Sequence, residues 1–175
     1  MIKGLLTEYL KSNDKFDLLT LTKGVASGVA FLHFHNLVHG DIRAASILID
    51  NHGNPRLADT GLLKILDASP LMPDGGSTST YRWMAPELHN DPKRTSASDV
   101  YAFTVTSWEI YNKGDAPFPG LRELQIGNKI LQDDRPPRLP DVGDAIWELW
   151  RIGWHKDIGQ RPKMSQYVDH LRSIA

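Results

Sequence analysis

The 175-residue chain contains no cysteine, which excludes disulfides, thiol chemistry and cysteine-based zinc sites. It also lacks an excess of either charge, because 20 Lys and Arg side chains face 21 Asp and Glu side chains. A nucleic-acid surface needs a clear basic excess, so we expect no nucleic-acid partner. No apolar run reaches the ~18 residues of a membrane helix, and Lys3 interrupts the first apolar residues. We therefore expect a cytoplasmic protein without a signal peptide or a membrane contact.

A helical pattern occupies most of the chain. Leu5, Leu6, Tyr9 and Leu10 suggest a short opening helix. Asp14 is a candidate N-cap for a longer helix whose apolar residues recur every three or four positions. Later in the chain, Ser98 is a candidate cap for an apolar helix that ends near Tyr111. Amphipathic spacing predicts three further helices, at residues 121–132, 143–154 and 164–173.

One short segment has the residue types of a β-hairpin. The β-branched run at 47–49, the turn residues at 50–55 and the segment 56–58 predict a small hairpin. Residues 63–80 are rich in proline, glycine, serine and threonine, which predicts a long loop. The expected fold is mainly α (α+β overall), with about six or seven helices and one β-hairpin in a single domain over residues 1–175.

Two carboxylates flank the predicted hairpin. Asp41 precedes its first strand and Asp59 follows its second, so both lie at the same end. Two acids with a base on adjacent loops suit phosphoryl transfer, in which positioning and charge neutralisation do most of the work. One acid accepts a hydroxyl proton and the other holds Mg²⁺. The spacing alone fits a pair of loop-capping aspartates at least as well.

The motifs around these acids resemble those of protein kinases. Residues 39–46 (HGDIRAAS) resemble the catalytic loop H-R-D-L-x-x-x-N, residues 59–61 (DTG) resemble D-F-G, and residues 85–87 are A-P-E. Further segments that resemble the kinase C-terminal lobe lie at 98–103, 108–110, 117–120, 135–137 and 154–162. The resemblance covers essentially the whole chain. It implies a kinase C-lobe with an activation segment at about 59–87.

The resemblance implies a role for each residue of the reaction centre. Asp41 would be the catalytic base that orients the substrate hydroxyl, and Arg43 would bind and neutralise the γ-phosphate of ATP. Asp59 would bind Mg²⁺, together with Ser46 in place of the usual asparagine. Thr80 would be a positioning hydroxyl beside Asp41 and Arg43.

Other residues are implied to bind the nucleotide or to support the site. Leu48 would form the floor under adenine, and Ala58 would line the same pocket. The residues implied as structural support are His39, Asp99 and the ion pair of Glu87 with Arg161. In the family, the aspartate at the position of Asp99 accepts backbone N–H bonds from the catalytic loop.

Two clues bear on the acceptor. Residues 41–45 (DIRAA) resemble the loop of some tyrosine kinases. Residues 80–87 (TYRWMAPE) instead resemble the tyrosine-kinase-like group, whose members mostly phosphorylate serine and threonine. We expect a serine/threonine acceptor on a protein substrate, with ATP and Mg²⁺ as cofactors.

Three positions depart from the kinase pattern. Gly40 replaces an arginine that in many kinases receives a phosphate from the activation segment, so that receptor is expected to be lost. Ser46 replaces the second Mg²⁺ ligand, which predicts a weaker metal site. Thr60 replaces an aromatic side chain that helps to set the active state.

The chain also contains no G-x-G-x-x-G loop and no V-A-I-K lysine, the marks of the small ATP-covering lobe. We expect weak binding of ATP and Mg²⁺ and little or no activity from this chain alone, with a small lobe upstream as a possible missing partner. A pseudokinase lobe that scaffolds other proteins, through the face at 117–131 or through the surface that a small lobe would cover, is the alternative. A truncated gene product without function is a third interpretation.

Overall fold

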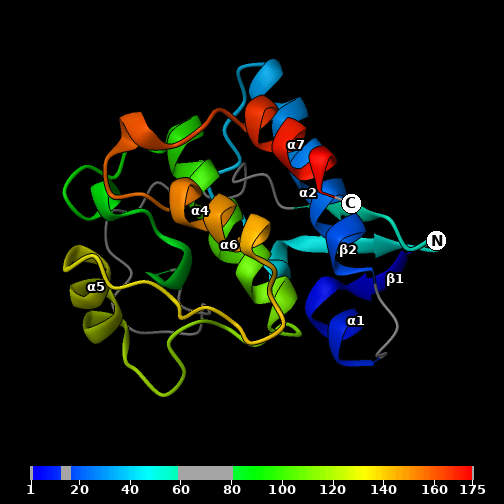
Figure 1. Cartoon of the computed structure of the whole chain (residues 1–175), viewed down its shortest axis with the longest axis horizontal. Coiled ribbons are helices and arrows are strands. Elements are labelled where there is room, and N and C mark those ends of the chain that lie inside the picture. Colours follow the sequence, from blue (N-terminus) through cyan, green and yellow to red (C-terminus); the bar gives the residue numbers. More distant parts are fainter. Residues whose placement is uncertain (1, 13–16, 59–80, 175) are drawn as a thin grey trace.

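The computed structural model describes residues 2–12, 17–58 and 81–174. Within these ranges the chain is mainly helical, with one small sheet, as the sequence predicts. The α-helices are α1 (Leu6–Ser12), α2 (Leu18–Phe34), α4 (Ser96–Tyr111), α5 (Glu123–Leu131), α6 (Asp144–Gly153) and α7 (Met164–Ser173). Short 3₁₀ turns lie at Ala44–Ser46, Tyr81–Trp83, Pro86–His89 and Ile158–Gln160. In Figure 1 the sheet lies toward one edge of the molecule, beside α1, α2 and α7, and the helices α4, α5 and α6 lie on the other side.

Helix α4 forms the centre of the fold. It is buried on every side, because every residue from Ser98 to Ile110 except Ala102 is buried. An all-round buried helix needs partners for its polar groups, and these are the groups that shape the site described below. Thr95 caps the helix, since its Oγ1 accepts the N–H of Ser98 at 3.1 Å and its own N–H donates to the Ser98 hydroxyl. The prediction of Ser98 as the cap is therefore wrong, although Ser98 is the other half of the capping box.

Helix α2 packs against α7 and α4 and leads into the site (Figure 1). Its apolar stripe, which includes Leu21, Val25 and Val29, is buried as the periodicity predicts. The N-cap is Asp17, whose carboxylate accepts the N–H of Thr20 at 3.0 Å. The predicted cap, Asp14, is thus wrong by three residues and lies outside the described residues.

The sheet has three antiparallel strands in the order β1–β2–β3, with β1 at Ile2–Leu5, β2 at Ile47–Asp50 and β3 at Pro55–Leu57. The predicted hairpin is β2–β3, in which Leu48 pairs with Arg56. The strand β1 was not expected, and Leu5 lies in it opposite Leu48, so the opening helix starts one residue later, at Leu6. The alternation of β2 places Ile47 and Ile49 in the core and leaves Leu48 half-buried.

Asp50 closes the turn of the hairpin. Its carboxylate accepts the N–H groups of Asn54 and His52 and pairs with Arg56. These hydrogen bonds, that of Asn54 first, hold the pKa of Asp50 well below its usual range. The turn therefore fixes the register of β2 and β3.

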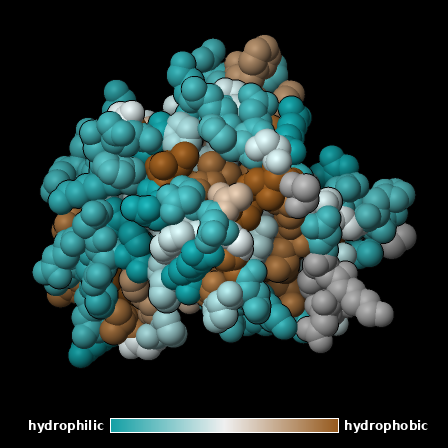
Figure 2. Space-filling model, in the orientation of Figure 1, coloured by the Kyte–Doolittle hydropathy of each residue, from teal (hydrophilic) through white to brown (hydrophobic). Residues whose placement is uncertain are grey.

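The C-terminal third completes the core. Trp147, Trp150 and Trp154 stack edge to face or tilted, with ring centroids 5.9–6.4 Å apart, along one face of α6 and its C-cap. Figure 2 shows that the face seen in Figure 1 is mostly hydrophilic, with hydrophobic side chains gathered between α6 and α7. No helix among the described residues is both long and apolar enough to span a bilayer.

Candidate active site

Residues 39–46, which resemble the kinase catalytic loop and are called the catalytic loop below, lie between α2 and β2 and follow α4 from Asp99 to Glu109. Asp99, which is 1% exposed, anchors the first part of this loop. Its Oδ2 accepts the N–H of His39 at 2.8 Å, and its Oδ1 accepts the N–H of Gly40 at 2.8 Å. His33 Nε2, on α2, lies 3.0 Å from the same Oδ2. One buried carboxylate thus ties α2, α4 and the catalytic loop together.

Glu109 anchors the second part of the same loop. It is 2% exposed, and its Oε2 accepts both the N–H of Ala44 and the indole N–H of Trp83 at 3.0 Å. Burial raises the pKa of Glu109 to about 7, against these hydrogen bonds and the charge of Arg43, which lower it. Glu109 had no predicted role in the site. A lone glutamate inside the apolar run of α4 was the available signal, because a buried charge needs dedicated partners.

Asp41 and Arg43 face each other across the loop. Arg43 Nε lies 3.6 Å from Asp41 Oδ2, and the two side chains are 14% and 11% exposed. The conformation is held from within, because the Ser46 hydroxyl donates to the carbonyls of Asp41 at 2.7 Å and of Arg43 at 2.9 Å. It also accepts the N–H of Arg43 at 3.2 Å. A carboxylate and a guanidinium are therefore presented together, with limited access to solvent.

The chain returns to this loop at Ala58. Its N–H donates to the carbonyl of Ser46 at 3.0 Å, and its carbonyl lies 3.2 Å from His39 Nε2. His39 Nδ1 accepts the N–H of Asp41 at 3.2 Å, so Nε2 carries the proton and donates to Ala58. Both backbone groups of Ala58 thus bind the catalytic loop. Asp59, the next residue, and Thr80 lie outside the described residues.

The ion pair expected between Glu87 and Arg161 is present. Arg161 Nη1 and Nη2 donate to the two carboxylate oxygens of Glu87 at 2.7 and 2.8 Å, and the Arg161 side chain is fully buried. Its guanidinium also lies over the ring of Tyr101, 5.2 Å from the centroid. Such bidentate geometry fixes the A-P-E segment against the C-terminal part of the fold. None of the hydrogen bonds of the pair within the described part of the chain goes to residues 39–46.

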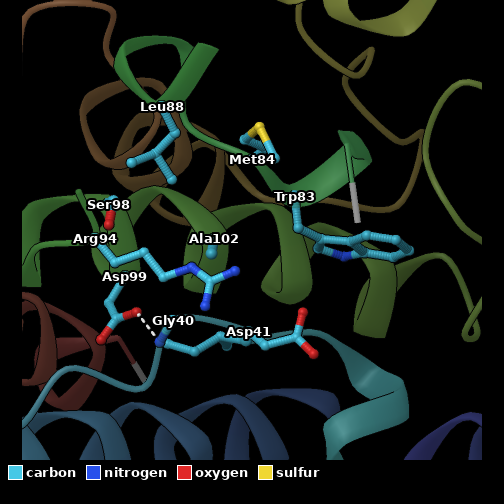
Figure 3. Close-up of a pocket in the computed structure, with 10 residues that line it drawn as sticks. Gly40, Asp41, Trp83, Met84, Leu88, Arg94, Ser98, Asp99 and Ala102 are labelled. Atoms are coloured by element: carbon cyan, nitrogen blue, oxygen red, sulfur yellow. Dashed lines mark hydrogen bonds between the residues drawn. The ribbon is translucent and has the colours of Figure 1, made fainter. Parts of the chain in front are cut away.

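A small pocket of about 30 Å³ lies between the catalytic loop and α4. Figure 3 shows Asp41 and Trp83 at one end of it, Asp99 and Ser98 at the other, and the side chain of Arg94 running between them over Gly40. The wall opposite the loop is apolar and includes Met84 and Leu88. Neither Arg94 nor Trp83 was singled out from the sequence as part of a site.

The described residues provide only part of a Mg²⁺ site. They contain no group of three His, Asp or Glu side chains that could hold a metal ion. Ser46 offers a hydroxyl oxygen, the hard donor type that Mg²⁺ prefers, but it is 3% exposed and already engaged within the loop. The N–H of Ala58 donates to the backbone carbonyl of Ser46, not to its hydroxyl. The hydroxyl of Ser46 is of a donor type that fits Mg²⁺, and the predicted charged ligand, Asp59, lies outside the described residues.

Comparison with known proteins assigns a family to this arrangement. The family model "Protein tyrosine and serine/threonine kinase" matches residues 1–171. Ephrin type-B receptor 3 of Xenopus laevis is 34% identical over 99% of this chain and 19% of its own length. Serine/threonine-protein kinase STY17 of Arabidopsis thaliana is 28% identical over 99% of this chain and 31% of its own length. The chain thus spans less than a third of the curated relatives that it matches.

Proposed function

Because the chain belongs to the protein tyrosine and serine/threonine kinase family, we propose that it is the C-lobe of a domain that transfers a phosphoryl group from ATP to a protein hydroxyl. The lobe spans residues 1–175 in this proposal, with the activation segment at about 59–87. The observation that carries it is the pair Asp41 and Arg43, 3.6 Å apart in a loop that two buried carboxylates of α4 hold in place. That degree of preorganisation is what phosphoryl transfer requires.

The roles follow from the chemistry of the groups. Asp41 accepts the proton of the attacking hydroxyl. Its side chain is 11% exposed, so a substrate hydroxyl can reach the carboxylate from solvent. Arg43 balances the negative charge that develops on the transferred group. Asp59 and Ser46 would hold Mg²⁺, which neutralises phosphate charge when bound. Leu48 and Ala58 would form the nucleotide floor, and a small lobe would cover it.

Serine or threonine is the proposed acceptor. The segment at 80–87 supports this choice, as does the similarity to a protein named as a serine/threonine kinase. The acceptor can be identified by acid hydrolysis of the labelled product, followed by separation of the released phosphoserine, phosphothreonine and phosphotyrosine. Phosphotyrosine as the main product would refute this part of the proposal.

The test is transfer of labelled phosphate from ATP to a peptide mixture by the natural full-length protein and by its Asp41→Asn variant. We expect a loss of at least about 100-fold in the variant, the usual scale for a general base. Asp141→Asn, a change at an exposed aspartate outside the site, is the matched control and should keep full activity. Unchanged transfer by Asp41→Asn would refute the role. The 175-residue chain alone should show little or no turnover.

The alternative is a pseudokinase lobe that scaffolds a protein partner. Two observations favour it. The Ser46 hydroxyl is already hydrogen-bonded to the carbonyls of Asp41 and Arg43, and Gly40 stands where many kinases have an arginine. Arg82 also donates to the carbonyls of Pro117, Phe118 and Leu121, which gives the face at 117–131 a fixed shape. If the full-length protein shows neither transfer nor ATP-dependent thermal stabilisation, the scaffold is the better interpretation.

A further inference from the structure

Arg94 lies over the catalytic loop because Gly40 has no side chain. A Cβ atom at position 40 would sit 2.5 Å from Arg94 Cδ and 3.3 Å from its Nε and Nη1. Arg94 would have to move away from such a Cβ, so its path depends on the glycine. Gly40 also adopts φ +77°, a conformation that favours glycine. The loop thus has no side chain at position 40, and a guanidinium from the segment that precedes α4 lies over the glycine instead.

The guanidinium of Arg94 carries a charge that its surroundings do not balance. Among the described residues, no carboxylate or other acceptor pairs with it. The two acids that line the same pocket are already engaged, Asp41 with Arg43 and Asp99 with three N–H donors. The preceding residue, Lys93, is exposed and adds a second positive charge. The pocket therefore combines compensated carboxylates with unused guanidinium donors.

Access and environment both favour an anion here. Arg94 is exposed at the mouth of the pocket, so a ligand can reach it from solvent. Met84 and Leu88 form an apolar wall, which strengthens a charge-assisted hydrogen bond relative to one in open water (Figure 3). The planar fork of a guanidinium matches the oxygens of a phosphate group better than a lysine does.

We propose that Arg94, lying over Gly40, forms a binding site for a phosphate group on the catalytic loop. The choice of phosphate over carboxylate rests on the proposed function, because phosphomonoesters are the products of that reaction. The ligand is either a phosphorylated protein side chain or free inorganic phosphate. Arg94, from the segment before α4, would thus supply the positive charge that a glycine at position 40 cannot provide.

Binding can be measured without turnover, which separates this proposal from the kinase activity itself. The 175-residue protein, labelled with ¹⁵N, is titrated with inorganic phosphate and with N-acetyl-phosphothreonine amide. The reporters are the N–H of Gly40, which bonds to Asp99, and the indole N–H of Trp83, which bonds to Glu109. Both should shift, and Arg94→Gln should weaken phosphate binding about tenfold, the scale of a charge-assisted bond. Arg122→Gln, at another exposed arginine, should not.

A second pair of variants tests the geometry without removing a charge. Gly40→Ala places a Cβ against Arg94 and should also weaken phosphate binding. Gly120→Ala is the control, because Gly120 has φ +75° and an added Cβ there would meet no atom within 4 Å. The backbone strain is therefore matched and only the clash differs. Gly120→Ala should bind phosphate like the parent protein.

Two outcomes support the proposal and two would overturn it. Binding of both ligands supports a phosphorylated side chain as the occupant, and binding of inorganic phosphate alone supports the site with the free anion as its ligand. Equal affinity of the parent protein and Arg94→Gln, or reporters that move in neither titration, would overturn the proposal.

Discussion

Helix α4 holds the catalytic loop with two buried carboxylates, one near each end, and they bind it in different ways. Asp99 uses both oxygens, because Oδ1 accepts the N–H of Gly40 and Oδ2 accepts that of His39 and lies 3.0 Å from His33. Glu109 uses one oxygen for both of its donors. The two side chains are equally buried, at 1% and 2% exposure, so burial does not distinguish them.

The difference decides which carboxylate needs its charge. The donors of Glu109, from Ala44 and Trp83, converge on Oε2 and leave Oε1 able to carry a proton without breaking either bond. Its pKa of about 7 fits that arrangement. Asp99 has N–H groups directed at both oxygens, so neither position suits a donor. The number of oxygens engaged therefore predicts which residue an amide can replace.

The largest expected effect comes from Asp99→Asn. The new NH₂ group must face the N–H of either His39 or Gly40, which leaves a buried donor without an acceptor and removes a charge-assisted bond. We expect the free energy of unfolding to fall by about 4 kcal/mol, measured by urea denaturation. Asp141→Asn, at an exposed site, should change it by less than about 0.5 kcal/mol. A loss below about 1 kcal/mol for Asp99→Asn would break the comparison.

Glu109→Gln should show the opposite behaviour, and its effect should depend on pH. Because burial raises the pKa of Glu109 from its ordinary value of 4.5 to about 7, the folded protein keeps a proton that the unfolded chain releases between these values. The stability contributed by this group therefore falls as pH rises from about 4.5 to about 7, by roughly 3 kcal/mol in all. The amide in Glu109→Gln mimics the protonated carboxyl group and removes that loss.

The measurement is urea denaturation of both proteins at pH 5 and pH 8. The stability of the variant relative to the parent should rise by roughly 3 kcal/mol between the two pH values, with the variant the more stable at pH 8. Comparing the two proteins at each pH cancels the titration of all other groups. A difference that is independent of pH would mean that Glu109 is ionised throughout and that its free Oε1 does not hold a proton.

The two anchors of the catalytic loop, Asp99 and Glu109, differ in how far their roles could be predicted from the sequence. Asp99 was identified from the sequence as an acceptor of catalytic-loop N–H bonds because it belongs to a recognisable motif, and the structure places it on His39 and Gly40. Glu109 was missed because no motif marks it, although its partner Ala44, 65 residues away, is about as distant in sequence as the partners of Asp99. Local patterns report periodicity and turn chemistry, whereas a contact of that kind depends on the assembled fold.

The same limit explains the errors in the elements. The ends of α5, α6 and α7 were predicted to within about two residues, since amphipathic spacing is local. The strand β1 could not be found, because four residues acquire strand character only from pairing with β2. The cap of α4 was misplaced because Thr95, Ser96 and Ser98 are all capping residue types.

A smaller effect is expected from His33→Phe, which removes one of the three groups that Asp99 engages. The imidazole is 12% exposed, and its Nε2 lies 3.0 Å from Oδ2. The backbone donors remain, so we expect a loss of about 2 kcal/mol in the free energy of unfolding, about half that of Asp99→Asn. His52→Phe, at an exposed turn position, is the control and should stay within about 0.5 kcal/mol of the parent. A loss as large as that of Asp99→Asn would show that His33, not the backbone donors, is the main partner.

The smallest expected effect concerns the caps of α4. It tests whether the two ends of the helix also differ in how they are capped. Thr95 caps the end near Asp99 through a reciprocal pair of hydrogen bonds with Ser98. At the other end the backbone N–H of the C-cap, Asn112, donates to helix carbonyls, while its side-chain amide donates outside the helix, to the carbonyl of Asp115. Thr95→Ala should therefore lower the free energy of unfolding by about 1 kcal/mol, with Ser96→Ala as a nearly silent control one residue further on. Because the cap lies four residues before Asp99, fraying should also raise the hydrogen-exchange rate of the His39 and Gly40 amides while leaving that of Ala44 unchanged. Equal acceleration at Ala44 would mean that α4 responds as one rigid body and that its two anchors are coupled.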